Sequence, residues 1–360
     1  IAVSSTTPAH AVDLQGSGAS FVDPLLQACK AGFAKASSHS YVYTSTGSGT
    51  GKKNSDSKIG DFWFSDSAHT ATTKRSTVFH APIVAAPIAV LVNLPAKKDI
   101  YLSSTTVAKI FAGEITKWND PAIVADNNRS VTTTVYKKDA QGNAVKDKSG
   151  NPVVLRTGTK SIIYTLPDQP IKVIFRADGS GTTAIFTDYL SKVSASFKEK
   201  VGQGTTVNWT ADATISGKGN EGVAANVNRV KNSIGYVEFA YAKKNHMTYV
   251  QLENAAGKFV QPEEKSFAAA AAGVDWSKFP GMATFITNAP GADSWPITGA
   301  TFIVVYKDPA DKQKADEVLK FFDYGFKEGK DMATSLDYVP MPDATTDFIR
   351  KNVWTKINTK

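Results

Sequence analysis

Cysteine and long apolar runs are almost absent from this 360-residue sequence. The single cysteine, Cys29, excludes an intramolecular disulfide and any zinc site built from several cysteines. Its apolar neighbours in a helical pattern indicate a buried, unreactive thiol. The longest apolar run, residues 83–94, is too short to span a membrane and contains Pro87 and Asn93. These absences predict a soluble protein without disulfides or a metal site.

A concentrated basic segment with a nucleic-acid motif is also missing. The net charge is +8, but lysine and arginine are scattered and acidic residues interleave with them. No basic helix or recognised binding motif accompanies the charge, so we expect no nucleic-acid partner. The length is sufficient for two domains with a substantial core.

Motifs for catalysis and cofactor binding are largely absent. The sequence has no Gly-x-Ser-x-Gly elbow and no His-Glu-x-x-His pair, and its five histidines are dispersed. The segment 47–53 fails as a nucleotide P-loop because Lys53 stands where serine or threonine is required. The segment 179–184 fits the looser dinucleotide fingerprint after a strand, which keeps an oxidoreductase as an alternative. We expect no cofactor, no metal and no enzyme.

Three Gly-Ser-Gly turns, centred on Ser17, Ser48 and Ser180, follow segments with strand character. Residues 172–192 are the clearest case, because an apolar run of strand length is followed by glycines and then by apolar residues at helical spacing. The unpaired N–H groups of a helix N-terminus bind anions, and Arg176 adds a planar cationic fork. The pattern therefore predicts a site for a small oxyanion.

Strands alternate with helices along the rest of the chain, which predicts an α/β architecture. Residues 61–66 read as a strand that ends in Asp66, and residues 83–94 read as a buried strand that crosses between domains. Residues 130–169 differ, because two polar turns separate β-prone runs, and we interpret them as an exposed hairpin.

Several of these segments resemble the family of periplasmic phosphate-binding proteins that serve bacterial high-affinity phosphate ABC importers. The likeness covers nearly the whole chain and is most specific at Arg176-Ala-Asp-Gly-Ser-Gly-Thr182. The other segments that carry it are residues 16–21, 47–49, 64–66, 206–209, 217–220, 234–238, 295–297 and 319–323.

The resemblance implies two α/β lobes joined by crossing strands, with one phosphate in the cleft between them. Lobe 1 is then residues 12–84 and 297–360, and lobe 2 is residues 85–296. The crossings are expected near Val84 and Ile297. The excursion at 130–169 is longer than the usual connection in the family.

The resemblance also implies the residues that contact phosphate. From lobe 1, Ser20, Phe21 and Ser48 would offer hydroxyl or backbone donors, and Asp66 would contact the anion directly. From lobe 2, Arg176, Ser180, Gly181 and Thr182 would close on it, while Asp178 would orient Arg176. Two positions depart from the family: Ser20 stands where threonine is common, and Val22 stands where proline usually follows the phenylalanine.

An aspartate in an anion site has a chemical use. Phosphate near neutral pH still carries a proton, and an ionised carboxylate is purely an acceptor, so Asp66 can accept a hydrogen bond from phosphate. Sulfate has no such proton and would meet a like charge with unpaired oxygens. The sequence thus predicts discrimination against sulfate.

Residues 1–11 end in an Ala-x-Ala pattern, which predicts the remnant of a secretory signal peptide or a flexible leader, and a periplasmic location. The expected partners are inorganic phosphate and the membrane subunits of a phosphate ABC importer, with the protein itself a monomer. The alternatives are a receptor for another oxyanion or a phosphate ester, a phosphoryl-handling enzyme, and an extracellular scaffold or inhibitor of the same fold.

Overall fold

The computed structural model describes residues 11–69, 77–95, 99–212 and 214–359. Residues 1–10, where most of the predicted leader falls, lie outside the described residues. Two compact units are present: a smaller one at Thr116–Pro170, and a larger one formed by the described residues before and after it. Within the described ranges, no helix combines the length and the apolar character that a membrane crossing requires.

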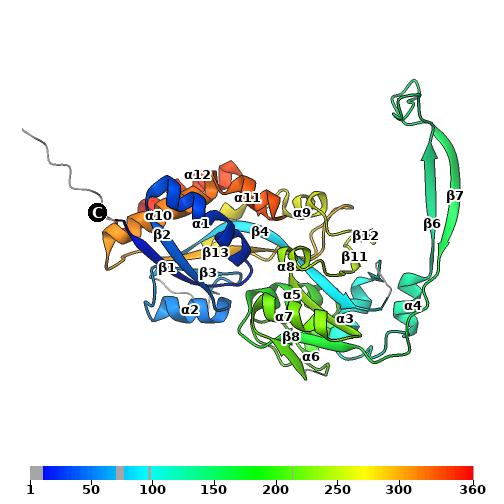
Figure 1. The fold of residues 1–360 in the computed structure, drawn as a ribbon, viewed down its shortest axis with the longest axis horizontal. Helices are drawn as coiled ribbons and strands as arrows, with labels where there is room; N and C mark the ends of the chain where they lie inside the picture. The colour runs from blue at the N-terminus through cyan, green and yellow to red at the C-terminus, as the bar shows by residue number, and fades with distance from the viewer. Residues whose placement is uncertain (1–10, 70–76, 96–98, 213, 360) are drawn as a thin grey trace, which may run out of the picture. The chain divides into compact units, whose positions relative to one another are not determined.

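One curled sheet runs through the larger unit, in the order β2-β1-β3-β13-β4-β10-β8-β9, and β14 pairs with β4 (Figure 1). Its strands among the described residues are β1 Asp13–Gly18, β2 Ser40–Ser45, β3 Phe62–Ser65, β4 Val78–Asn93, β8 Lys172–Arg176, β9 Ile215–Gly217, β10 Ser233–Glu238, β13 Thr298–Tyr306 and β14 Val339–Pro340. The strand β4 pairs with β13 as far as Pro87 and with β10 from Ile88 onward. It therefore joins the strands of two α/β lobes.

The first lobe is built on the parallel strands β1, β2 and β3, with β13 antiparallel to β3. Its helices are α1 Asp23–Ser37, α2 Ser48–Asp56, α10 Lys312–Lys327, α11 Lys330–Ser335 and α12 Asp343–Asn352. Figure 1 shows α1, α10 and α12 on one side of these strands and α2 on the other. An aromatic cluster fills the space between sheet and helices: the ring of Phe321 on α10 lies 5.1 Å from the rings of Phe33 and Phe62. The C-terminal helices thus complete the core that the N-terminal strands begin.

The second lobe is built on β8, β9 and β10, which are parallel to one another. Its helices are α3 Ser104–Phe111, α5 Gly181–Val193, α6 Ala195–Lys200, α7 Gly219–Arg229 and α8 Phe239–Lys244. Phe186 on α5 stacks on Tyr236 of β10 with ring centres 4.3 Å apart, and Phe111 packs edge-on against Phe186 at 4.7 Å. This packing fixes α5, and with it the glycine turn that precedes the helix.

Shorter elements complete the larger unit. A small sheet contains β5 Tyr101–Leu102, β11 Gln251–Glu253 and β12 Phe259–Val260, followed by α9 Glu264–Ala271. Short 3-10 helices lie at Trp276–Lys278, Pro280–Met282 and Trp354–Lys356.

The smaller unit contains α4 Pro121–Asn127 and the antiparallel pair β6 Arg129–Tyr136 and β7 Val154–Ile162. Asp120 caps α4, because its carboxylate accepts a hydrogen bond from the Ala122 N–H at 2.9 Å. Trp118 is fully buried, and its backbone N–H donates to Gln169 at 3.1 Å. The predicted excursion at 130–169 therefore contains a two-stranded hairpin.

Two of the three predicted glycine turns were wrong. Gly16, Ser17 and Gly18 are the last residues of the strand β1, and the helix α2 begins at Ser48. Gly51 serves close packing instead: a Cβ there would lie 2.6 Å from Gly18 Cα and 2.8 Å from the Phe64 carbonyl oxygen. Gly51 lets α2 approach the strands β1 and β3, a purpose that the local sequence does not reveal.

Candidate anion-binding site

The carboxyl ends of four strands converge on one buried region of the larger unit. Ser20 and Phe21 follow β1, Ser48 follows β2 and opens α2, and Asp66 follows β3. Arg176 is the last residue of β8. Parallel strands present their carboxyl ends at the same edge of a sheet, which is where α/β proteins place their ligands.

Asp66 is the buried carboxylate of this region, with 2% of its surface exposed. The Thr301 hydroxyl donates to its Oδ1 at 2.6 Å, and the Ser48 hydroxyl donates to its Oδ2 at 3.2 Å. Burial raises the pKa of Asp66 to about 7, although Thr301, Arg176 and Ser48 all act to lower it. The carboxyl is therefore poised to gain or lose a proton near neutral pH.

Arg176 supplies the positive charge. Its Nε donates to Asp178 Oδ1 at 2.8 Å and its Nη2 donates to Oδ2 at 2.6 Å, a two-point pairing that fixes the plane of the guanidinium group. The Gly219 N–H also donates to Asp178 Oδ1, at 3.0 Å. Burial alone would raise the pKa of Asp178, but Arg176 and Gly219 outweigh it and hold that pKa below its ordinary value.

The remaining nitrogen of this guanidinium group has no hydrogen-bond partner in the part of the chain that the structure describes. Arg176 Nη1 is buried and makes no hydrogen bond to any of the described residues, and the side chain as a whole is 2% exposed. A buried cationic donor left unpaired is costly, because desolvation is not repaid. Arg176 Nη1 therefore marks a position where an anionic acceptor would complete the hydrogen bonds of the guanidinium group.

The N-terminus of α5 lies against Asp66 and Ser48. A Cβ on Gly181 would lie 2.5 Å from both Asp66 Cβ and Ser48 Oγ, so only glycine allows the backbone to come this close. Ser180 caps the helix, since its hydroxyl oxygen accepts the Thr183 N–H at 3.0 Å. The first-turn N–H groups of α5, which have no partner within the helix, are thereby placed beside the carboxylate.

Asn220 connects the two sides of the site, and the sequence-based prediction missed this role. Its backbone N–H and its side-chain Nδ2 donate to Ser20 Oγ at 3.1 and 2.9 Å, and Nδ2 also lies 3.3 Å from Thr182 Oγ1. The Glu238 N–H donates to Asn220 Oδ1 at 3.0 Å and fixes the amide. Because the Ser20 hydroxyl oxygen already accepts two bonds, its own hydrogen remains available for an anion.

The structure brings the predicted residues together, all of them buried or nearly so. Ser20, Phe21, Ser48, Asp66, Arg176, Ser180, Gly181 and Thr182 lie in this region, with Asp178 behind the arginine. The Phe21 carbonyl oxygen accepts a bond from the Tyr338 hydroxyl at 2.6 Å, so the group that Phe21 has left to offer an anion is its backbone N–H.

Two contacts of this region were missed for different reasons. Asn220 is the last residue of the segment 217–220, which is one of the segments that resemble the phosphate-binding family. The resemblance could therefore have indicated Asn220 as a site residue. Thr301 lies 235 residues from Asp66 in the sequence, and nothing near it indicates a polar role within an apolar strand.

The chemistry of the region follows from these contacts. Hydroxyl and backbone donors surround one buried arginine and one buried carboxylate, and the described residues contain no cluster of side chains suited to a metal ion. Such a site suits a small oxyanion that itself carries a hydrogen. Two α/β lobes with a water-excluded, donor-lined site between them define the class of two-lobed substrate-binding proteins.

Comparison with known proteins agrees with this class. A family model for the PBP superfamily domain matches residues 4–328. The phosphate-binding protein PstS of Haemophilus influenzae is 39% identical to this chain over 352 residues, covering 97% of this chain and 95% of that protein. The chain therefore belongs to the PBP superfamily and, within it, to the family of PstS phosphate-binding proteins.

Solved structures share the fold. The high-affinity periplasmic phosphate-binding protein PfluDING, solved with phosphate, superimposes with a TM-score of 0.65 at 21% identity, over 94% of this chain and 93% of that chain. A protein of Clostridium perfringens assigned as the substrate-binding protein of a phosphate ABC transporter, with bound phosphate, gives a TM-score of 0.59 at 16% identity, over 92% and 100%. The two-lobed α/β fold expected from the sequence is confirmed.

Proposed function

We propose that this protein binds inorganic phosphate at the site around Asp66 and Arg176 and delivers it to an ABC importer. The proposal rests on two features of one buried region. Arg176 Nη1 has no hydrogen-bond partner among the described residues, and the two carboxylate oxygens of Asp66 accept bonds from Thr301 and Ser48. The membership of the PstS family supports the same ligand.

Asp66 selects phosphate by its hydrogen. With a pKa of about 7, Asp66 and a phosphate ion share one proton between them at neutral pH. Whether the hydrogen resides on the ligand or on the carboxyl, a donor faces an acceptor and the bond is made. Sulfate brings no hydrogen, so it forms this bond only when Asp66 itself is protonated, and the ionised carboxylate repels it.

The crowding of the site favours the free ion over its esters. Ser20, Ser48, Asp66 and Thr182 are each exposed by 2% or less, and the backbone at Gly181 packs directly on Asp66. An organic substituent on one phosphate oxygen would have to displace these contacts. This geometry favours inorganic phosphate over a phosphate ester.

Delivery depends on closure of the two lobes around the ion. Contacts between the segments that follow β2 and β8 hold the closed form, among them the Gly49 N–H donating to Gly179 at 2.8 Å. The Tyr241 hydroxyl on α8 donates to the Ser20 carbonyl oxygen, just after β1, at 2.6 Å and adds a second contact between the lobes. Bound phosphate favours this form, which the membrane subunits of the importer would recognise in the periplasm. We propose that the protein acts there as a monomer, with lobe boundaries near Val84 and Ile297 and no catalytic turnover.

Titration calorimetry of phosphate-stripped protein with phosphate and with sulfate tests the proposal. At about pH 9, two units above the pKa of Asp66, we expect tight, one-to-one binding of phosphate and at least about a hundredfold weaker binding of sulfate. Equal affinities, or no binding of either ion, would overturn it. Incubation with p-nitrophenyl phosphate tests for an enzyme, and sustained release of p-nitrophenol by pure protein would contradict the assignment as a receptor.

A further inference from the structure

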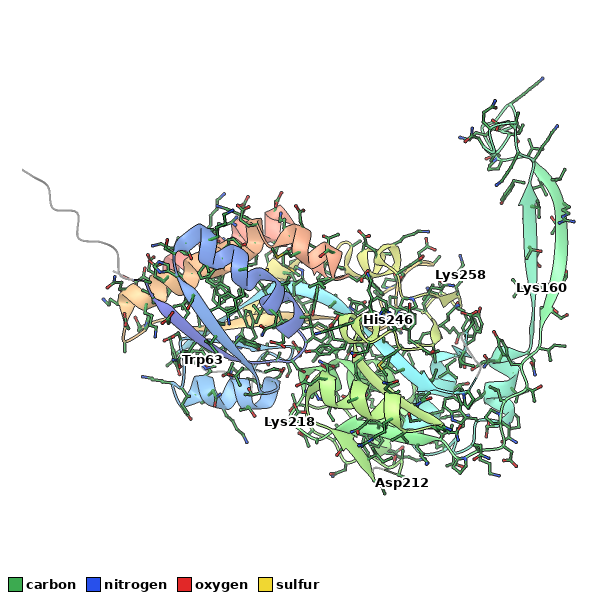
Figure 2. The ribbon with its side chains drawn as sticks, in the orientation of Figure 1. Trp63, Lys160, Asp212, Lys218, His246 and Lys258 are labelled. Carbon is green, nitrogen blue, oxygen red and sulfur yellow. The ribbon has the colours of Figure 1, made fainter. Side chains whose placement is uncertain are left out.

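The hairpin of the smaller unit concentrates the positive charge of the chain. We call residues 130–161 the hairpin arm. It contains six lysine or arginine residues and two aspartates, a net charge of +4, which is half of the chain's +8 in less than a tenth of its length. The six cations are Lys137, Lys138, Lys146, Lys148, Arg156 and Lys160, all exposed and without an ion pair to any described residue. Figure 2 labels Lys160 on β7.

The tip of the hairpin arm uses its two acidic residues internally. Asp139 Oδ1 accepts the N–H groups of Gln141 and Asn143 at 3.0 and 2.9 Å. Asp147 Oδ1 accepts those of Ser149 and Asn151 at 2.8 and 2.9 Å, in a second turn of the same form. The carboxylates therefore hold the backbone of the turns, while the four lysines of the tip extend to solvent.

The two turns are a repeat in sequence and in structure. Residues 138–145 and 146–153 both follow the pattern Lys-Asp-x-x-Gly-Asn-x-Val. Backbone bonds of 2.8 Å close a ring at their junctions: Lys137 donates to Val153, Val153 to Val145, and Val145 to Lys137. The valines at 145 and 153 are half-buried at this point. The lysines are thus carried on a tip with its own hydrogen-bonded frame.

The strands of the hairpin arm add apolar side chains next to the cations. Val131 pairs with Lys160 and Val135 pairs with Arg156, so these four residues share one face. Of the eight large hydrophobic side chains that the described residues leave exposed, four belong to the arm: Val135, Tyr136, Val154 and Leu155, at 37%, 43%, 52% and 62%. A basic surface interleaved with apolar and tyrosine side chains matches the layer where lipid headgroups meet acyl chains.

We propose that the hairpin arm binds an anionic lipid bilayer surface. The charge complementarity favours lipid phosphates, and the exposed apolar residues would enter the interfacial layer. A second copy of the chain is a poor partner, because two arms of charge +4 repel one another. An acidic protein is less suited, because hot spots of protein interfaces fill pockets, and the described cavities of this chain are lined by residues outside the arm.

Co-sedimentation with large unilamellar vesicles of POPC and POPG, mixed 3:1, tests the proposal against pure POPC vesicles. The arm variant changes four lysines to glutamine, namely K137Q, K138Q, K146Q and K148Q. The matched control changes four exposed lysines outside the arm, namely K198Q, K231Q, K258Q and K265Q, and lowers the net charge equally. Each lysine near an anionic surface is worth about fivefold in partitioning, so the arm variant should bind at least about 100-fold more weakly. The control should retain binding within about fivefold.

The apolar contribution has its own test. L155S keeps every charge of the hairpin arm, and it should leave binding more sensitive to added salt than the parent protein. Calorimetry with phosphate checks that all variants keep the parent affinity and are folded.

Three outcomes would overturn the proposal. One is parent protein that ignores POPG vesicles, and another is a control variant that loses binding as far as the arm variant does. The third is an arm variant that binds POPG vesicles as well as the parent protein does but lowers phosphate uptake by the importer reconstituted in neutral lipid, since the partner of the arm would then be a protein. None of these outcomes changes phosphate affinity, so they are distinct from a failure of the proposed function.

Discussion

Asp66→Asn removes the negative charge of the carboxylate and replaces one of its two acceptor oxygens by an amide NH2 group, while the shape of the side chain is kept. The Thr301 and Ser48 hydroxyls that donate to Asp66 at 2.6 and 3.2 Å can rotate and accept from an amide, so the local packing is preserved. The variant therefore isolates the electrostatic role of the carboxylate. We expect it to fold and to bind anions, with altered selectivity.

The magnitude follows from two opposing effects. Like charges about 4 Å apart repel by about 4 kcal/mol at an effective dielectric constant of about 20, and sulfate regains this energy when Asp66 loses its charge. Phosphate also loses repulsion, but it gives up a charge-assisted hydrogen bond worth about 1.5–3 kcal/mol. The repulsion is relieved for both anions and cancels in the ratio. At about pH 9, where Asp66 is ionised in the parent protein, the ratio of phosphate to sulfate affinity should therefore fall by the value of the lost hydrogen bond, about 10- to 150-fold.

Competition calorimetry measures this ratio directly, with stripped parent and variant proteins titrated with each anion at constant ionic strength. Thermal unfolding without ligand serves as the control for folding. If the variant kept the parent ratio within about threefold, the carboxylate would have no part in discrimination. The reasoning about the shared hydrogen would then be refuted.

Four further results are expected. Sulfate affinity of the parent should rise about tenfold per pH unit as pH falls toward about 7 and level off below it, because Asp66, with its raised pKa of about 7, then holds a proton that it can donate. Asp66→Asn should give a flat profile, and a flat profile for the parent would contradict this. Arg176→Ala should weaken both anions by at least about a hundredfold and leave their ratio unchanged, as calorimetry would show. Gly181→Ala should weaken phosphate by a similar factor without lowering the melting temperature of the ligand-free protein, because its Cβ would meet Asp66 Cβ at 2.5 Å only in the closed form; Gly325→Ala, with 3.5 Å to its nearest neighbour, is the control and should bind normally. Thr301→Val should weaken phosphate by about tenfold through loss of the 2.6 Å bond, with Thr301→Ser restoring it; equal binding by both variants would exclude the hydroxyl.

Much of the fold was open to prediction because its signals are local. The strand predicted at 61–66 is β3 at Phe62–Ser65, and the strand, glycine turn and helix predicted over 172–192 are β8 at Lys172–Arg176 and α5 at Gly181–Val193. The run at 83–94 was predicted as a buried crossing strand, and the strand β4 does exchange β13 for β10 along its length. It begins earlier, at Val78, because pairing with β13 extends it beyond the apolar run.

The sequence by itself determined the donor chemistry: glycines and hydroxyls close to strand ends, one arginine in Arg176 and one carboxylate in Asp66. These features arise within single segments, where local backbone preferences decide them. Only the tertiary structure decided which acceptors are already occupied. Thr301 reaches Asp66 from a strand 235 residues away, and Asn220 bridges Ser20 and Thr182, because contacts between lobes depend on packing that no local pattern encodes. The raised pKa of Asp66 has the same origin, since burial is a property of the tertiary fold.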